Sequence, residues 1–415
     1  MFYLYVALFA TFSPLTLKAD HCPICLADFH GRSAAPVVVK TQCCGNLFDL
    51  DCISRCFVDQ PIGSRRCAMC RQNPMPVVNQ NTSESHPDTF FPDRTFYSAC
   101  LDGDLNQVER SLAQGVNVNA AMIADFTPLM LASNRGHTDI VERLINAGAN
   151  LGAARSNGAT ALFLATEYGN TDCVKRLIEA GADLNVQTKI GATPLFIAAV
   201  YGNTDCVKLL INAGVELNAR AKNGATPLFI AAKKNNTECV QFLINAEADL
   251  NARTDTGASP LYVAAAKGNT DCVKLLINAG ADLNAQTKDG GTPLFMAAQE
   301  NHADCVKLLM EAGADLNAAL LNGATALYVA AAKGNTECVQ LLINAGADLN
   351  AVWIEHGATP LHIAALENNT DIVRLLIDAG ADLNAQTGSG ATPLTIATKM
   401  GNSDCVELLT KAGAK

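Results

Sequence analysis

Eight cysteines lie within a short stretch near the start of the chain, and their spacing is that of metal ligands. Cys-x-x-Cys pairs stand at both ends of this stretch, with four more cysteines between them: Cys22 and Cys25, then Cys43, Cys44, Cys52 and Cys56, then Cys67 and Cys70. Thiolates two residues apart can bind one tetrahedral zinc ion. A segment of about 50 residues buries little apolar surface, so bound metal would supply much of its folding free energy. The pattern predicts a zinc-binding domain over residues 20–71.

The order of these residues resembles that of a RING finger. Cys22-Pro23-Ile24-Cys25 opens the motif, and Pro36 to Val39 stands where a short strand precedes the third ligand in that family. Cys44 to Ile53 is similar to the family's C-G-H-x-F-C-x-x-C-I, and Cys67 to Arg71 is similar to its C-P-x-C-R.

The resemblance implies two zinc ions bound by interleaved pairs of ligands. The first ion would be bound by Cys22, Cys25, Asp49 and Cys52. The second would be bound by Cys44, Cys67, Cys70 and, in place of the family's histidine, Cys43. Asn46 stands at the histidine position, and Asp49 stands at the fifth ligand position, where a carboxylate can still bind zinc. Cys56 is either a substitute ligand or a small residue at the family's tryptophan position.

A RING finger performs no covalent chemistry itself. It holds a ubiquitin-conjugating enzyme, loaded with ubiquitin, in a reactive pose, which is catalysis by positioning. The residues that match the family's docking groove and its arginine are Ile24, Pro61, Ile62 and Arg71. The resemblance therefore implies a ubiquitin-protein ligase without a catalytic side chain of its own. Ala68 replaces the family's proline, so a purely structural zinc module in a non-enzymatic adaptor is the alternative.

Residues 1–19 are almost entirely apolar, and three interpretations stay open. The stretch has the length of a signal-peptide core, although no basic residue precedes it, and it is short for the ~20 residues of a membrane span. It is a secretion signal, an anchor or a buried apolar segment. A secreted domain would permit disulfides among Cys22 to Cys70 instead of zinc. Ubiquitin transfer instead predicts a cytosolic site of action, which a secretion signal fits if one cell delivers the protein into another.

From about residue 94 onward the sequence repeats itself every 33 residues. The units begin at Thr127, Thr160, Thr193, Thr226, Ser259, Thr292, Thr325 and, after one inserted residue near Trp353, at Thr359 and Thr392. Thr-Pro predicts the start of a first helix, and a Gly-Asn-Thr-Asp turn is expected to cap a second. Gly-Ala predicts its end, because glycine accepts the left-handed C-cap conformation. An Asp-Leu-Asn-Ala run then leads into a polar tip.

This unit resembles the ankyrin repeat, whose T-P-L-x-x-A-A-x-x-G pattern is matched almost letter for letter. The resemblance implies a mostly α-helical solenoid of about ten helix-turn-helix units over residues 94–415, including two diverged ends. One such unit cannot bury its apolar face alone, so stability would come from stacking neighbours. Such arrays bind protein partners, which here would be the substrate.

Seven cysteines share the same position in their repeats: Cys173, Cys206, Cys239, Cys272, Cys305, Cys338 and Cys405. The two other full repeats carry Ile140 and Ile372 there. A position that exchanges cysteine for isoleucine is an apolar core position, where a free thiol acts as a small hydrophobe. Stacked helices ~8–10 Å apart also exceed the ~7 Å Cα limit of a disulfide. We therefore predict core thiols, and the same for Cys100.

Residues 72–93 contain Pro74, Pro76, Pro87 and Pro92 among polar residues, which predicts a flexible linker. In the array, the repeats differ most at their tips and at the exposed ends of their first helices. The residues predicted to bind protein are Arg155, Tyr168, Lys189, Tyr201, Lys222, Lys233, Lys234, Trp353 and His356. Trp353 is the only tryptophan, and its ring either anchors a partner or packs on the neighbouring repeat.

The overall composition excludes several other classes of protein. Charged residues make up 17% and hydrophobic residues 49%, which is incompatible with wholesale disorder. The formal net charge is −10, whereas a nucleic-acid-binding protein would present a basic stripe to the phosphates. We expect neither nucleic acid nor membrane as a partner, and no motif of another enzyme class is present.

Overall fold

The computed structural model describes residues 38–41, 47–49, 77–79, 85–86, 93–121 and 125–415. Two compact units divide the chain, Met1–Asp183 and Leu184–Lys415. Within the described ranges, no helix combines the length and the apolar character that a membrane crossing requires.

A small antiparallel sheet belongs to the first unit. Its strands follow the order β2-β1-β3-β4. They are β1 (Val38–Thr41), β2 (Leu47–Asp49), β3 (Val77–Asn79) and β4 (Ser85–His86). The sequence predicts a flexible linker over residues 72–93, but two segments of that range are strands of this sheet. Val77 and Val78 are β-branched residues suited to a strand, and they pair with Thr41 and Lys40.

Among the described residues, twenty helices form ten consecutive pairs, as the repeat predicts. In the first unit they are α3 (Arg94–Asp102), α4 (Leu105–Ala113), α5 (Pro128–Arg135), α6 (Thr138–Asn146), α7 (Ala161–Glu167) and α8 (Thr171–Glu179). In the second unit they are α9 (Pro194–Tyr201), α10 (Thr204–Asn212), α11 (Pro227–Lys234), α12 (Thr237–Asn245), α13 (Pro260–Ala266), α14 (Thr270–Asn278), α15 (Pro293–Gln299), α16 (Ala303–Glu311), α17 (Ala326–Lys333), α18 (Thr336–Asn344), α19 (Pro360–Leu366), α20 (Thr370–Asp378), α21 (Pro393–Met400) and α22 (Ser403–Lys411).

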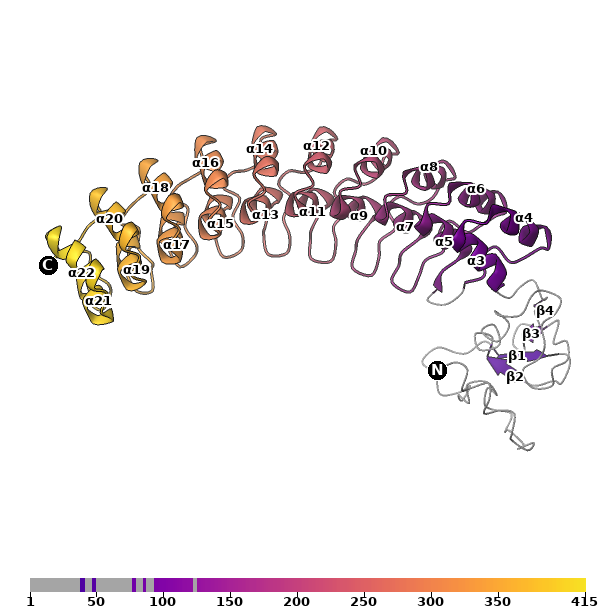
Figure 1. Cartoon of the computed structure of the whole chain (residues 1–415), viewed down its shortest axis with the longest axis horizontal. Helices are drawn as coiled ribbons and strands as arrows, with labels where there is room; N and C mark the ends of the chain where they lie inside the picture. The colour runs from indigo at the N-terminus through magenta and orange to yellow at the C-terminus, as the bar shows by residue number, and fades with distance from the viewer. Residues whose placement is uncertain (1–37, 42–46, 50–76, 80–84, 87–92, 122–124) are drawn as a thin grey trace, which may run out of the picture. The chain divides into compact units, whose positions relative to one another are not determined.

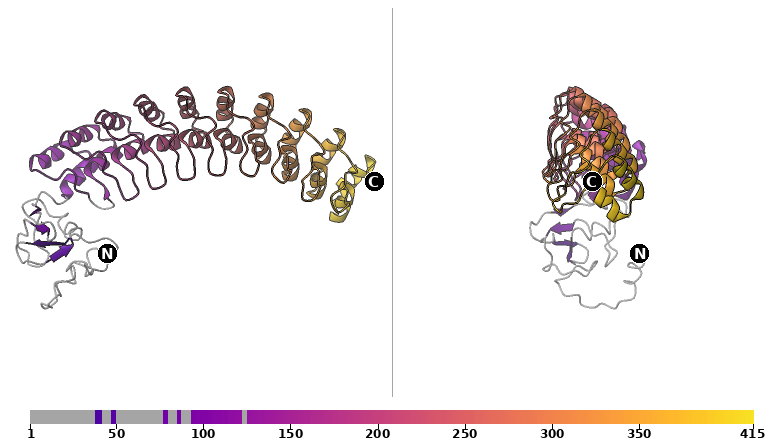
Figure 2. Two further views of the ribbon diagram at one scale, coloured as in Figure 1. Left: turned by 180° about the vertical axis from the view of Figure 1, so that it is seen from behind. Right: turned by 90° about the vertical axis from the view of Figure 1, so that its left-hand side faces the viewer.

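The helices of each unit lie in two layers. The first helices of successive repeats are neighbours in one layer, and the second helices are neighbours in the other (Figure 1). The hairpin loops that join successive repeats project on the side of the first helices, and the reverse view shows the same arrangement (Figure 2). One side of each stack is therefore formed by the first helices and the hairpin loops, and the other side is formed by the second helices.

The first helices begin as the sequence predicts. Thr226 accepts a hydrogen bond from the Phe229 amide at 3.3 Å, and Pro227 occupies the first helical position. Proline costs nothing there, because the first-turn amides of a helix have no intrahelical partner. The same threonine or serine cap recurs in the neighbouring repeats, for example at Thr193 and Ser259.

The expected capping of the second helices by the Gly-Asn-Thr-Asp turn is only partly right. Asn269 is the N-cap residue of α14, but its side chain makes no hydrogen bond to that helix. Its Nδ2 donates instead to the carbonyl oxygens of Ala232 and Lys233 in the preceding repeat, at 2.7 and 3.2 Å. Both carbonyls lie in the last turn of α11, so the asparagine joins two repeats where the sequence suggested a local cap.

Candidate protein-binding face

Most residues predicted to bind zinc lie outside the described residues: Cys22, Cys25, Cys43, Cys44, Cys52, Cys67 and Cys70. The same is true of the predicted docking residues Ile24, Pro61, Ile62 and Arg71. Asp49 is the exception, since it ends β2, and its backbone pairs with that of Val38. Among the described residues, no group of three or more His, Cys, Asp or Glu side chains could hold a metal ion.

The periodic cysteines of the array are core residues, as predicted. All seven, together with Cys100, are buried free thiols. Burial raises the pKa of Cys338 to about 11 and that of Cys100 to about 12. A thiolate is the form that binds metal or attacks an electrophile, so burial of these thiols disfavours both reactions in the folded chain.

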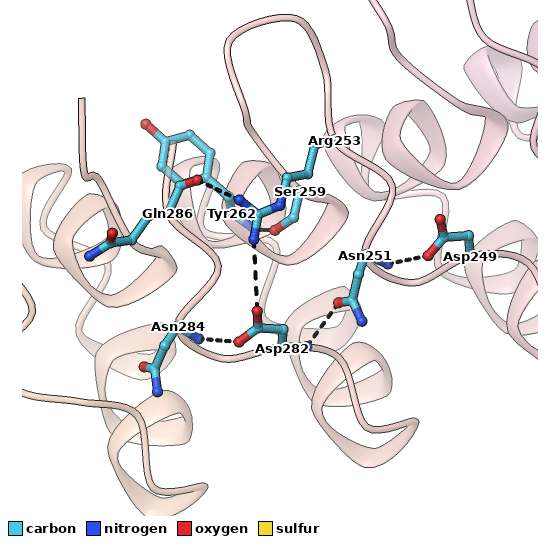
Figure 3. A network of polar contacts seen from close by, with 8 residues as sticks. All are labelled: Asp249, Asn251, Arg253, Ser259, Tyr262, Asp282, Asn284 and Gln286. Atoms are coloured by element: carbon cyan, nitrogen blue, oxygen red, sulfur yellow. Dashed lines mark hydrogen bonds and ion pairs between the residues drawn. The ribbon is translucent and has the colours of Figure 1, made fainter. Parts of the chain in front are cut away.

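A ladder of carboxylate and amide side chains joins the loops that follow the second helices (Figure 3). Asp249 accepts from the Asn251 amide at 2.9 Å, and Asn251 Oδ1 accepts from the Asp282 amide of the next repeat, also at 2.9 Å. The pattern continues from Asp282 to Asn284. These Asp-Leu-Asn runs therefore tie their loops to the next repeat, which holds the hairpins that follow them in a fixed register.

The hairpin tips of the second unit are also joined by backbone hydrogen bonds. The Lys222 amide donates to Ile190 O, and the Leu321 amide donates to Asp289 O, both at 2.9 Å. At Gly257, which has a φ of +87°, an added Cβ would lie 3.0 Å from Thr287 Cα of the next hairpin. A glycine is needed there both for the positive φ and for the close approach of the two backbones. The tips thus form a continuous edge.

The structure places the predicted binding residues on the hairpin side of their units. Lys189, Lys222 and His356 are exposed on hairpins, whereas Lys233, Lys234, Tyr168 and Tyr201 are exposed at the ends of first helices. Tyr168 and Tyr201 have 62% and 58% of their surface exposed. Arg155 is half-buried, with its guanidinium 4.0 Å from the ring centroid of Phe126. Long polar and aromatic side chains are therefore exposed on this side of each unit.

Trp353 packs on the neighbouring repeat, which is the second of its two predicted interpretations. Its ring lies edge-on to Tyr328, with the ring centroids 6.1 Å apart, and His356 packs against it at 4.7 Å. Its Nε1 is buried and has no hydrogen-bond partner among the described residues. The large apolar side chains that its loop exposes are instead Val352 and Ile354, at 47% and 67%.

Sequence reasoning missed three exposed tip residues. Ile190 has 67% of its surface exposed at the tip between Lys189 and Gly191. Arg220 and Arg253 each follow the run that ends in Asn-Ala, and each side chain reaches an acidic residue of the next repeat: Arg220 to Asp255 at 3.7 Å and Arg253 to Asp282 at 3.9 Å. Arg220 and Arg253 occupy the same position in successive repeats, and this was the sequence signal that could have identified them.

Comparison with known proteins agrees with this architecture. A family model described as ankyrin repeats (3 copies) matches residues 96–188, 181–254, 248–319, 317–387 and 355–415. The crystal structure of the human ASB11 ankyrin repeat domain is 28% identical, with a TM-score of 0.49, and the match covers 53% of this chain and 98% of that chain. None of the curated proteins compared with the chain matches it.

Proposed function

The chain belongs to the ankyrin-repeat family, whose arrays are protein-interaction domains, and we propose that it is a RING-type ubiquitin-protein ligase. In this proposal the array binds a protein substrate, and residues 20–71 bind a ubiquitin-loaded conjugating enzyme. The observation that carries it is the pair of Cys-x-x-Cys motifs, Cys22/Cys25 and Cys67/Cys70, around Cys44 and Cys52.

The donor atoms fit two zinc ions. Seven thiolates and the carboxylate of Asp49 provide four ligands for each ion, all of types that zinc accepts in tetrahedral sites. Bound zinc would supply folding free energy to a segment with few apolar residues to bury. The pairing of β1 with β2, which precede and follow Cys43 and Cys44 in the sequence, supports folded structure at residues 38–41 and 47–49.

The chain's own residues would act by positioning. Ile24, Pro61 and Ile62 offer an apolar patch to the conjugating enzyme, and Arg71 offers donors that can hydrogen-bond ubiquitin and its carrier. The array meanwhile raises the effective concentration of substrate lysines near the thioester. No nucleophile of this chain is required, because the substrate lysine attacks the thioester.

Self-ubiquitination of the purified full chain tests the proposal. With a panel of ubiquitin-conjugating enzymes, we expect transfer that Cys22→Ser or Ile24→Ala abolishes. Ile190→Ala is the matched control, because Ile190 is an exposed isoleucine on the array with no proposed role in docking that enzyme. Absence of transfer across the panel would leave the second candidate, a non-enzymatic adaptor with a structural zinc module.

A further inference from the structure

Charge is sorted between the two sides of the second unit. The hairpin face is defined here as the hairpins and first helices within residues 186–201, 219–234, 252–267 and 285–300. It carries eight basic and three acidic residues: Lys189, Arg220, Lys222, Lys233, Lys234, Arg253, Lys267 and Lys288, against Asp255, Asp289 and Glu300. The second helices and loops that follow, to residue 317, carry three basic and ten acidic residues. The net charges are thus +5 and −7, within a chain of net charge −10.

The lysines of the hairpin face carry most of its available charge. All six are exposed, and none forms an ion pair within the part of the chain that the structure describes. The two arginines, in contrast, have partners within the chain: Arg220 lies 3.7 Å from Asp255, and Arg253 Nη1 donates to Gln286 O at 2.9 Å. Acidic residues of the face also accept hydrogen bonds within the chain: Asp289 accepts from Thr287 Oγ1 at 2.5 Å, and Glu300 accepts from Gln299 Nε2 at 2.9 Å. Six ammonium groups therefore face solvent without internal neutralisation.

An apolar section follows the basic section along the same edge. The next two hairpins expose Leu321 at 77% and Ile354 at 67%. Behind them lies a cluster that includes Phe295, Tyr328 and the half-buried Trp353. These aliphatic side chains, beside an aromatic cluster, offer apolar surface that an apolar group of a partner can bury.

The two sections form one continuous edge. Backbone hydrogen bonds join Lys288 to Thr256, Leu321 to Asp289, and Ile354 to Asn322. Successive repeats are ~10 Å apart, and an extended chain rises ~3.3 Å per residue, so about three peptide residues span one repeat. The edge from Lys189 to Ile354 therefore matches an extended segment of about fifteen residues.

We propose that the hairpin face binds an extended acidic segment of a protein, which ends in an aliphatic or aromatic anchor on Leu321 and Ile354. The lysines pair with Asp and Glu side chains, and the anchor buries apolar surface that is now exposed. This inference deepens the proposed function by naming the chemistry of the substrate. A nucleic acid fits less well, because the apolar section at Leu321 and Ile354 offers its phosphates no donors, whereas a peptide can place an apolar side chain there.

Fluorescence anisotropy with the full chain tests the inference. The probe is a labelled peptide of about fifteen residues, matched to the edge, with Glu and Asp followed by Leu-Phe-Leu. The triple variant Lys222→Glu, Lys234→Glu, Lys267→Glu should weaken binding about ten- to hundredfold, because three favourable pairs become repulsive. The matched control is Lys274→Glu with Lys307→Glu, which reverses exposed lysines on second helices and should leave the affinity unchanged.

The apolar end has its own pair of variants. Leu321→Ser with Ile354→Ser should weaken binding about tenfold, whereas Met400→Ser, at another exposed apolar residue, should have no effect. Equal binding of a peptide with Lys in place of Glu and Asp would overturn the inference, and so would tighter binding of a single-stranded oligonucleotide. The readout involves no ubiquitin, so peptide binding without ubiquitin transfer would refute only the ligase proposal, and transfer without peptide binding would refute only this inference.

Discussion

The chain uses cysteine in two regions with opposite consequences. In residues 22–70 two Cys-x-x-Cys pairs flank four more cysteines at irregular gaps, and no repeat offers another residue in their place. In the array they recur every 33 residues, share their position with Ile140 and Ile372, and are buried as free thiols. The residue type is the same, so spacing and the alternative residues at each position separate a proposed metal ligand from a core side chain.

Removal of metal is expected to give the largest difference between the two regions. Chelation of the full chain should release two zinc ions and abolish ubiquitin transfer, because in the proposed function bound metal would supply much of the folding free energy of residues 20–71. The helical circular dichroism of the array should be unchanged, since none of its thiols is in a metal-binding group. A parallel loss of the helical signal would contradict the idea that only residues 20–71 depend on metal.

The same substitution in each region should have unequal effects. Cys67→Ile should remove one zinc ion, measured by metal analysis, and with it transfer activity. Cys239→Ile should keep both ions, because the equivalent position holds isoleucine in two other repeats. It should cost about 1–3 kcal/mol of stability, because isoleucine adds volume to a core packed around cysteine. Denaturant unfolding measures that cost, and loss of zinc from the array variant would break the comparison.

Stability of the array should fall at alkaline pH. Burial raises the pKa of array thiols above the ordinary value of 9.0, for Cys338 to about 11. Above pH 9 the unfolded chain releases protons that the folded chain retains, so folding stability is full below that pH and declines as pH rises toward 11. Thermal unfolding of wild type and Cys338→Ala between pH 7 and about pH 10 should show a shallower decline for the variant. Equal slopes of stability against pH in the two proteins would contradict the assignment of the decline to buried thiols.

The smallest effect concerns another position identified by comparing repeats. Glu247 has a φ of +64°, where the equivalent residues include Gly214 and Gly280. A non-glycine residue is strained in this conformation, so Glu247→Gly should stabilise the array by about 1 kcal/mol. Gly280→Glu is the reverse control and should destabilise it by a similar amount, because φ is +87° there, and the added Cβ brings no clash since it meets no atom within 4 Å. Denaturant titration distinguishes the two signs.

The helical array could be predicted from sequence because its determinants are local and repeated. A threonine or serine precedes each first helix from α5 to α21, Ala-Gly follows most second helices, and stacking of similar units fixes the rest. The orientation of Trp353 could not be predicted, since it depends on Tyr328, which belongs to the preceding repeat. The pairing of Val78 with Lys40 was likewise invisible, because it joins residues far apart in the chain.

The candidate site was only partly predictable for a related reason. Lysines at the tips are visible as variable positions, but whether each is neutralised depends on neighbours in the next repeat. Arg220 and Asp255, for example, lie one repeat apart and meet at 3.7 Å. The segregation of charge between the two sides of the second unit emerges only when each residue is assigned to a hairpin or a second helix.

Thiol labelling of the full chain tests the separation of the two cysteine regions most directly. A maleimide reagent would be applied to the native protein, to the chelated protein and to the denatured protein, and modified peptides would be located by mass spectrometry. We predict almost no labelling in the first state, labels confined to residues 22–70 in the second, and labelling of all 16 cysteines only in the third. Labelling of the seven proposed zinc-binding cysteines without chelation, or of the array cysteines before denaturation, would contradict the account.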